Sequence, residues 1–199
     1  MATIVVPFRG PGGKQRLTAV SEDVRAAIAQ AMLGDVLEAC LASAPTVVVT
    51  NDQLARDLAE EMGARTVGDP GGGQGAAVSS ALAALGQGVA LIVNADLPCA
   101  EPGDLLALAC AVPAGGMALV EASDGTTNAL GLARPSLFAP LYGPGSAARF
   151  RAHAASVGAA VVAVELPNLY TDVDTMEQLE LLRERVGRRT LATMALVLS

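Results

Sequence analysis

The chain has 199 residues and a formal net charge of −7; 52% of its residues are hydrophobic and 3% are aromatic. A chain of this length is most simply one domain, which we expect to span residues 1–199 and to bury about 70% of the surface of its unfolded form. The acidic charge excludes a general nucleic-acid binder, because such a protein needs a basic stripe to neutralise phosphates. A core of Ala, Val and Leu favours helices packed closely on a sheet.

Cysteine usage and hydropathy indicate the cellular setting. Cys40, Cys99 and Cys110 have no CxxC spacing, which indicates neither a zinc site nor a disulfide framework, and we expect reduced thiols in a cytoplasmic protein. We expect no signal peptide, and no membrane partner because no apolar run reaches the ~18 residues of a membrane span. The apolar tail Leu191–Leu198 is expected to form an edge strand or a packed end, with a partner contact as the alternative.

Apolar runs alternate with helical patterns along the chain. The predicted strands are, in order, 3–7, 46–50, 64–67, 89–95, 117–122, 128–133 and 160–166. The predicted helices are one from N-cap Ser21 to about residue 41, one ending at Gly63, 76–85, 101–112, one starting near 146, and about 176–186. This alternation predicts an α/β fold, a three-layer sandwich with a mixed, mostly parallel sheet. The polar turn after residue 122 predicts a hairpin, and therefore one antiparallel strand.

The stretch Val89–Pro98, VALIVNADLP, organises the rest of the chain. Its apolar run is typical of a strand buried on both faces, and Asp96 follows at the carboxyl end, where ligands collect in open parallel sheets. Asp172 and Asp174 have i, i+2 spacing, so in an extended segment both side chains point the same way. We expect the three carboxylates to meet around Mg²⁺, which takes few carboxylates together with phosphate oxygens. The alternative is that Asp172 or Asp174 only caps the last helix.

The first loop, residues 8–16, is rich in Gly and carries Arg9, Lys14 and Arg16. It lacks the Gly and the Ser or Thr that a P-loop requires, and its glycines do not give the GxGxxG spacing of a dinucleotide site. A flexible loop with three cations and free backbone N–H groups is suited to wrapping a triphosphate and neutralising charge as pyrophosphate leaves. A solvated basic loop without a ligand is the alternative.

Two clusters of small polar residues, Thr126–Asn128 and Gly143–Ser146, precede a predicted strand and a predicted helix. Backbone amides at a helix N-terminus together with a Ser hydroxyl form an anion site, although ordinary turn and capping chemistry explains each cluster equally well. His153 lies within a predicted helix and is given no role. The chain offers no Ser-His-Asp or Cys-His arrangement for nucleophilic catalysis.

Eight segments follow one another in a characteristic order: VVPFRGPGGKQRL, DVLEA, VVVTND, DPGGG, ADLP, TTNALGLARP, YGPGS and TDVDT. From about Thr3 to Leu182 this order resembles the 2-phospho-L-lactate/phosphoenolpyruvate guanylyltransferases, which make the activated precursor of coenzyme F-420. ADLP is shared with many nucleotidyltransferases, whereas TNAL together with GPGS and DVDT is much more specific. The resemblance implies a GT-A-like nucleotidyltransferase fold and a transfer that depends on GTP and Mg²⁺.

The resemblance also implies roles for individual residues. The acidic set that holds the metal ion matches Asp96, Asp172 and Asp174. The residues that hold the phosphorylated acid match Thr127, Gly143 and Ser146. The basic pair of the family's first loop matches Lys14 and Arg16, which we expect to be catalytic together with Asp96. The expected nucleotide-binding residues are Arg9, Lys14, Arg16, Gly72 and Gly73.

The chain departs from the family pattern in three places. Gln15 replaces a small hydroxyl residue, Phe8-Arg9 stands where Val-Lys is usual, and Gln74-Gly75 follows the glycines where Leu-Asn is common. The third departure leaves open which group reads the guanine. Asp52 and Asp69 are acidic candidates for accepting from its N1 and N2 donors.

We therefore expect an enzyme that moves GMP from GTP onto phosphoenolpyruvate or 2-phospho-L-lactate and releases pyrophosphate. No general base is required, because the attacking phosphate is already an anion. The alternatives are a nucleotidyltransferase for another acceptor, such as a molybdopterin or a sugar phosphate, and a non-catalytic GTP-binding regulator on the same fold. The expected partners are GTP and a small phosphorylated carboxylic acid, and the sequence leaves the oligomeric state open, a homodimer included.

Overall fold

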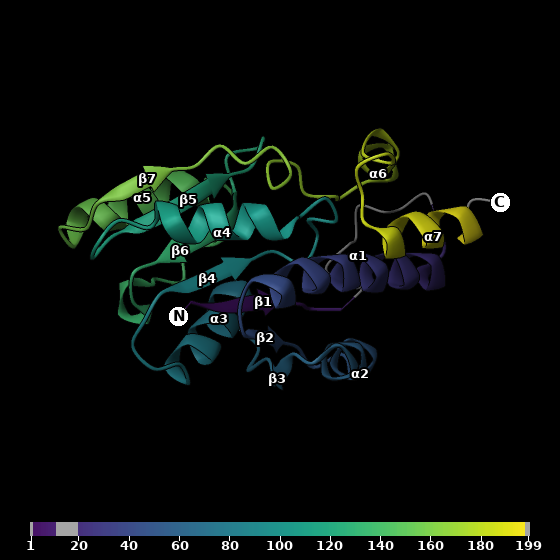
Figure 1. Ribbon diagram of the computed structural model, residues 1–199, viewed down its shortest axis with the longest axis horizontal. Helices are drawn as coiled ribbons and strands as arrows, with labels where there is room; N and C mark the ends of the chain where they lie inside the picture. The colour runs from purple at the N-terminus through teal and green to yellow at the C-terminus, as the bar shows by residue number, and fades with distance from the viewer. Residues whose placement is uncertain (1, 11–19, 198–199) are drawn as a thin grey trace.

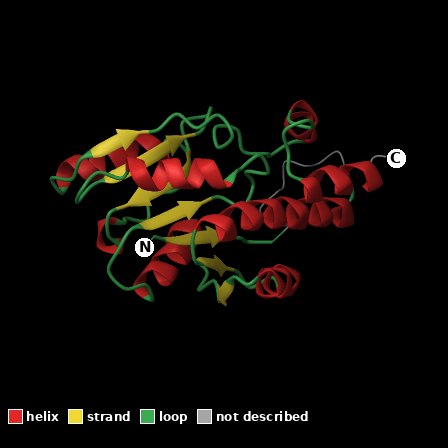
Figure 2. Cartoon of the chain, viewed as in Figure 1, coloured by secondary structure: helices red, strands yellow, loops and turns green. Residues whose placement is uncertain are grey.

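The computed structural model describes residues 2–10 and 20–197. Over these residues a seven-stranded sheet of order β3-β2-β1-β4-β6-β5-β7 is covered by helices (Figures 1 and 2). The strands are β1 Thr3–Pro7, β2 Thr46–Val49, β3 Arg65–Val67, β4 Ala90–Val93, β5 Met117–Glu121, β6 Thr127–Leu132 and β7 Val161–Ala163. The helices are α1 Glu22–Ser43, α2 Gln53–Met62, α3 Gln74–Ala83, α4 Pro102–Ala111, α5 Ser146–Ser156, α6 Met176–Leu181 and α7 Arg188–Val197, with a 3₁₀ turn at Pro135–Leu137.

The sheet is mixed and mostly parallel, as the sequence predicts. β1 pairs in parallel with β2 and β4, and β3 adds in parallel outside β2. β6 runs antiparallel to both of its neighbours, β4 and β5, and β7 pairs in parallel with β5. The predicted hairpin is confirmed as β5 and β6. Since β6 runs against the other strands of the described sheet, its first residues lie at the edge where those strands end.

Two apolar layers hold the helices on opposite faces of the sheet. Ile4 and Val6 of β1 face a cluster to which α1, α2 and α4 contribute, whereas Val5 faces a cluster built with α3 and α5. This alternation follows from the two-residue period of a strand and confirms the three-layer architecture. A third cluster joins α6 and α7 to the first half of α1 through residues such as Ile28 and Met194.

The C-terminal segment differs from the prediction. The predicted helix 176–186 ends at Leu181, and a further helix, α7, lies along α1 (Figure 1). The edge-strand expectation for the tail is therefore wrong over its described residues, and the packed-end expectation is correct; Leu198 lies outside the described residues. The helix is fixed by Asp35 of α1, whose carboxylate accepts from the backbone N–H groups of Arg189 (3.0 Å) and Thr190 (2.9 Å) in the first turn of α7.

The last strand is shorter than predicted. β7 covers Val161–Ala163 because its register with β5 ends at Leu119.

Two helix ends in the first part of the chain lie where the sequence predicts them. Ser21 caps α1, with its side chain accepting from the Val24 N–H at 3.4 Å. Gly63 ends α2 in the left-handed conformation, with φ of 96°. Local capping signals were therefore sufficient for the first two helices.

Within the described residues, one helix, α1, is long and apolar enough by length and composition to cross a membrane. In this fold 61% of that apolar window is buried, where α1 packs on α2, α4 and α7. A core helix passes the same test, so this feature gives no support to membrane insertion.

Candidate active site

The site is assembled at the edge of the sheet where β4 ends and β6 begins. Asn94, directly after β4, donates its backbone N–H to the Asn128 carbonyl at 3.1 Å and its side-chain amide to the Thr127 carbonyl at 3.2 Å. These two hydrogen bonds hold the start of β6 next to the turn that carries Asp96. An antiparallel strand is what allows the residues Thr127 and Asn128 to reach this edge from a strand's beginning.

Asp96, Asp172 and Asp174 meet, as the sequence predicts. Each offers a carboxylate oxygen, and these oxygens lie within 4.8 Å of one another. The backbone joins the two segments, because the Val173 N–H donates to the Asp96 carbonyl at 2.9 Å. Octahedral Mg²⁺ with oxygens at about 2.1 Å spaces its ligands by roughly 3–4 Å, so a small closure of the side chains fits the three groups to a divalent cation.

The alternative role for these carboxylates, capping of α6, belongs instead to Thr175. Its hydroxyl accepts from the Gln178 backbone N–H at 3.2 Å, and the Gln178 side chain accepts in return from the backbone N–H groups of Thr175 and Asp174. This reciprocal capping box fixes the start of α6 without either carboxylate of the acidic pair.

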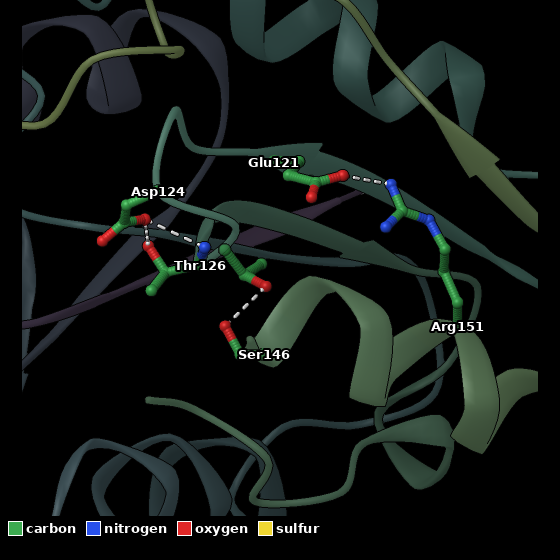
Figure 3. A network of polar contacts seen from close by, with 6 residues as sticks. Glu121, Asp124, Thr126, Ser146 and Arg151 are labelled. Atoms are coloured by element: carbon green, nitrogen blue, oxygen red, sulfur yellow. Dashed lines mark hydrogen bonds and ion pairs between the residues drawn. The ribbon is translucent and has the colours of Figure 1, made fainter. Parts of the chain in front are cut away.

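A buried hydroxyl pair lines the same cavity as the three carboxylates. The Ser146 hydroxyl donates to the Thr127 hydroxyl at 3.0 Å, and the two residues are 0% and 1% exposed (Figure 3). Because a hydroxyl has one proton and two acceptor positions, this bond leaves the Thr127 proton for a further acceptor. The pair thus presents a donor to an anion from a rigid position.

The expected backbone anion site at the start of α5 is partly occupied by the protein itself. The Ser146 N–H donates to the Gly143 carbonyl at 3.0 Å, and the Ala147 N–H to the Gly125 carbonyl at 3.3 Å. Turn chemistry therefore accounts for the Ser146 amide, as one of the two sequence interpretations predicts, whereas the Ala147 amide is taken up by a contact with the turn between β5 and β6. The hydroxyls and the positive end of the helix dipole are what this helix offers an anion here.

The turn before α5 is held in place by one arginine. The guanidinium of Arg149 donates to the carbonyls of Leu141 (2.8 and 3.1 Å), Tyr142 (3.1 Å) and Pro144 (2.6 Å). Gly143 has φ of 113° within this turn, a conformation that residues with a side chain rarely adopt. The path of the GPG segment therefore depends on a glycine and on Arg149, for which the sequence predicts no role.

These groups line one cavity of about 590 Å³. Its walls are formed by Gln74, Asn94, Asp96, Asp124, Thr126, Thr127, Tyr142, Gly143, Pro144, Ser146, Asp172 and Asp174. Asp124 is tied to the hairpin turn by the backbone N–H and hydroxyl of Thr126, at 2.9 and 2.6 Å (Figure 3). Burial raises the pKa of the Tyr142 phenol, so this side chain is neutral. The described wall thus holds four carboxylates and neither Lys nor Arg.

The expected nucleotide-binding residues are placed around a second cavity of about 770 Å³, which adjoins the first. Arg9, Gly72 and Gly73 line it, and Gln74, Tyr142 and Gly143 are common to both cavities. Gln74 begins α3 and donates to the Asn94 side-chain oxygen at 2.7 Å. Lys14 and Arg16 lie outside the described residues.

The two acidic candidates for reading guanine are engaged in local structure. Asp52 caps α2, accepting from the Ala55 N–H at 2.9 Å and from the Gln30 side chain at 3.2 Å. Asp69 accepts from the Gly71 N–H at 2.8 Å. Neither residue is among those that line the two cavities.

Comparison with known proteins decides the family. A family model described as the MobA-like NTP transferase domain matches residues 28–192. The chain is 37% identical to a phosphoenolpyruvate guanylyltransferase of Streptomyces scabiei over 215 aligned positions, which cover 98% of this chain and 97% of the relative. The chain belongs to the phosphoenolpyruvate/2-phospho-L-lactate guanylyltransferase family.

This guanylyltransferase family also includes a 2-phospho-L-lactate guanylyltransferase of Natrialba magadii, 35% identical over 194 residues, 86% of this chain and 78% of the relative. A solved structure from Desulfovibrio desulfuricans G20, provisionally named a nucleotide-diphospho-sugar transferase, superposes with a TM-score of 0.80 at 17% identity and covers 98% of this chain and 94% of that one. The GT-A-like fold is therefore confirmed, and the protein is a nucleotidyltransferase.

Proposed function

We propose that this family member transfers GMP from GTP to phosphoenolpyruvate or 2-phospho-L-lactate and releases pyrophosphate, an early step in the biosynthesis of coenzyme F-420. The supporting observation is the meeting of the Thr127–Ser146 hydroxyl pair with the carboxylates of Asp96, Asp172 and Asp174 in one cavity. The names of the family's members supply the two candidate acceptors.

The charge of the cavity supports the need for a bound cation. A phosphorylated carboxylic acid and a nucleoside triphosphate are both strongly anionic, and the described wall of the acceptor cavity carries four carboxylates. Two like charges at about 4 Å repel even in water, and more strongly in a partly buried site. A divalent metal ion on Asp96, Asp172 and Asp174 would neutralise phosphate charge and polarise the α-phosphate when bound.

The acceptor is held by groups that this chain provides directly. The Thr127 hydroxyl donates to a phosphate or carboxylate oxygen, while Ser146 fixes the orientation of that hydroxyl. The turn around Gly143, held by Arg149, closes the cavity on the side of the second, nucleotide cavity. Positioning of the two anions in line accounts for a large part of the rate enhancement in such a transfer.

The nucleotide is proposed to occupy the cavity lined by Arg9, Gly72 and Gly73. Glycines with positive φ, such as Gly73 at 101°, let the backbone approach phosphates closely. Arg9 supplies a cation there, and Lys14 and Arg16 are proposed to take the charge of the leaving pyrophosphate. Gln74 at the junction offers both an amide donor and an acceptor.

The reaction balances without a general base. A phosphate oxygen of the acceptor attacks the α-phosphorus of GTP and forms a new P–O bond. The bond from the α-phosphorus to the oxygen that bridges to the β-phosphorus breaks, and its electron pair leaves with pyrophosphate. Because the nucleophile is already ionised, no proton is removed, which agrees with a site of carboxylates and hydroxyls.

The test is pyrophosphate release with GTP and Mg²⁺, in the presence of phosphoenolpyruvate, 2-phospho-L-lactate or neither, with ATP and CTP as nucleotide controls. We expect release that requires GTP and one of the acids, and that acid is then the acceptor. Silence with both acids, while a sugar phosphate or a molybdopterin supports release, would overturn the proposed acceptor. Tight GTP binding without release under any condition would overturn the enzymatic assignment of this chain.

A further inference from the structure

Asn128 ties the strand that bears Thr127 to the segment that bears Asp172. It follows Thr127 in β6, where the register with β5 shifts by one residue: Glu121 pairs with Thr127 and Val120 with Ala129, so Asn128 is the extra residue of a β-bulge. Its side-chain amide donates to the carbonyls of Leu169 (2.9 Å) and Tyr170 (3.2 Å), the residues just before the acidic pair. The residue is 1% exposed, so both bonds are formed away from water.

The segment from 169 to 173 is thereby fastened on both sides of Asp172. Before Asp172 the Asn128 amide holds two consecutive carbonyls, and after it the Val173 N–H donates to the Asp96 carbonyl at 2.9 Å. The Leu169 side chain is fully buried in the core below. The carboxylate of Asp172 therefore projects from a short span of backbone whose two ends are fixed.

The chemistry at this position calls for an amide rather than a carboxylate. Both carbonyls need donors, and the side-chain oxygen of Asn128 is buried without a hydrogen-bond partner. Turning the amide over would place that oxygen against two carbonyl oxygens, which fixes the orientation of the group. An NH₂ group aimed at two adjacent carbonyls is thus what the side chain contributes.

We propose that Asn128 is a positioning residue for the metal centre: its amide sets the backbone from which Asp172 reaches the cation. The inference rests on the proposed function, because it requires a divalent cation at Asp96, Asp172 and Asp174. Two adjacent residues of β6 then serve different partners, Thr127 the acceptor and Asn128 the metal-binding segment. Groups that orient metal ligands typically change metal affinity by about 10- to 100-fold when removed.

The test is binding of Mn²⁺ to the nucleotide-free protein, followed by titration calorimetry or by electron paramagnetic resonance. In Asn128→Leu, which has a similar volume and no donor, we expect Mn²⁺ to bind about 10- to 100-fold more weakly. Asn128→Thr keeps one hydroxyl donor and suits a strand, so we expect an intermediate loss. Far-UV circular dichroism and a cooperative melt check the fold, and the Thr variant decides if the Leu variant does not fold.

Two controls separate this role from general stabilisation. Asn168→Leu removes an amide near the same segment whose partners, Asp104 and Arg185, are not among the residues that line the cavity, and Mn²⁺ affinity should stay within about twofold. Thr127→Val should likewise leave Mn²⁺ affinity unchanged while it weakens binding of the acceptor.

The outcomes distinguish the two proposals. Mn²⁺ binding that is lost in Asp172→Asn but unchanged in a folded Asn128→Leu would overturn the role of Asn128 and leave the proposed function standing. Absence of Mn²⁺ binding by the unsubstituted protein would overturn the proposed metal centre, and the role of Asn128 with it.

Discussion

The two cavities at the carboxyl edge of the sheet are built by different means. The cavity proposed for the acceptor is shaped by side chains that bind one another or bind backbone carbonyls: Ser146 binds Thr127, and Arg149 binds the turn around Gly143. The cavity proposed for the nucleotide is shaped mainly by backbone, since Gly71–Gly73 all have positive φ and the N-cap of α3 is Gly73, which has no side chain. The first cavity is therefore shaped more by side-chain contacts, and the second more by backbone conformation.

This difference indicates how each side recognises its ligand. A hydroxyl pair in a rigid position selects a particular arrangement of ligand oxygens, because a misplaced ligand leaves buried groups unpaired. A glycine-rich loop instead lets the chain come close to phosphates, which every nucleoside triphosphate shares. Substitutions of side chains should therefore affect the acceptor, whereas the nucleotide side should respond to changes of backbone freedom.

The largest effect is expected for the three clustered carboxylates of the first cavity. Asp172→Asn removes one charge from the proposed metal centre, and we expect kcat to fall by about 10³-fold or more, since a catalytic metal ion contributes several kcal/mol to transition-state stabilisation. Pyrophosphate release measures this loss. Asp124→Asn removes a carboxylate of the same cavity outside the cluster and should lower kcat much less; equal losses would contradict a centre confined to Asp96, Asp172 and Asp174.

The second-largest effect is expected on binding of the acceptor acid and not on binding of GTP. Thr127→Val and Ser146→Ala each remove one hydroxyl of the buried pair, and an unsatisfied buried partner costs about 1–3 kcal/mol. We expect KM for the acceptor acid to rise by roughly 10- to 100-fold in steady-state kinetics, with KM for GTP little changed. A parallel rise in both KM values would show that the pair does not belong to one substrate.

A smaller effect is expected for Arg149, which supports the turn before α5. In Arg149→Lys a single ammonium replaces the planar group that contacts three carbonyls, so the GPG segment loses part of its support and KM for the acceptor should rise by about 5- to 10-fold. The matched control is Arg151→Lys on the same helix, because Arg151 pairs with Glu121 away from the cavity and should leave both KM values unchanged (Figure 3). Equal effects of the two substitutions would assign the loss to α5 as a whole.

The sequence was sufficient where the signal is local. β1 matches its predicted bounds because a β-branched run, Thr3–Val6, is ended by a proline, and Ser21 and Gly63 mark helix ends by their own chemistry. α7 was missed because its start is capped by Asp35, which lies 154 residues before Arg189 in the chain. A contact so distant leaves no local pattern, and the apolar tail alone did not distinguish a strand from a helix.

The candidate site likewise contains residues whose roles the sequence predicted and residues whose roles it did not. Asp96, Asp172 and Asp174 were predicted to meet because each is an ionisable group next to a recognisable strand or helix end. Asn128 was predicted only as part of an anion-binding cluster, and Arg149 was given no role, because both bind backbone carbonyls, and a carbonyl is present at every residue. Groups that act on the backbone become visible only when the fold has brought the two segments together.

The smallest effect is expected on the nucleotide side. Gly73→Ala places a Cβ on a residue with φ of 101°, where the nearest neighbour, the Arg9 guanidinium at 3.5 Å, leaves room. The loss therefore comes from backbone strain of about 1–3 kcal/mol, which the loop relieves by shifting away from its present path. Because the loop relieves part of this strain, we expect KM for GTP to rise by about 5-fold in pyrophosphate-release kinetics while KM for the acceptor stays the same. Gly86→Ala, at a glycine with open space and without positive φ, should change neither KM value. A Gly73 variant that weakened the acceptor instead would mean that the two cavities are coupled through Gln74, and the division between a cavity shaped by side chains and one shaped by backbone would fail.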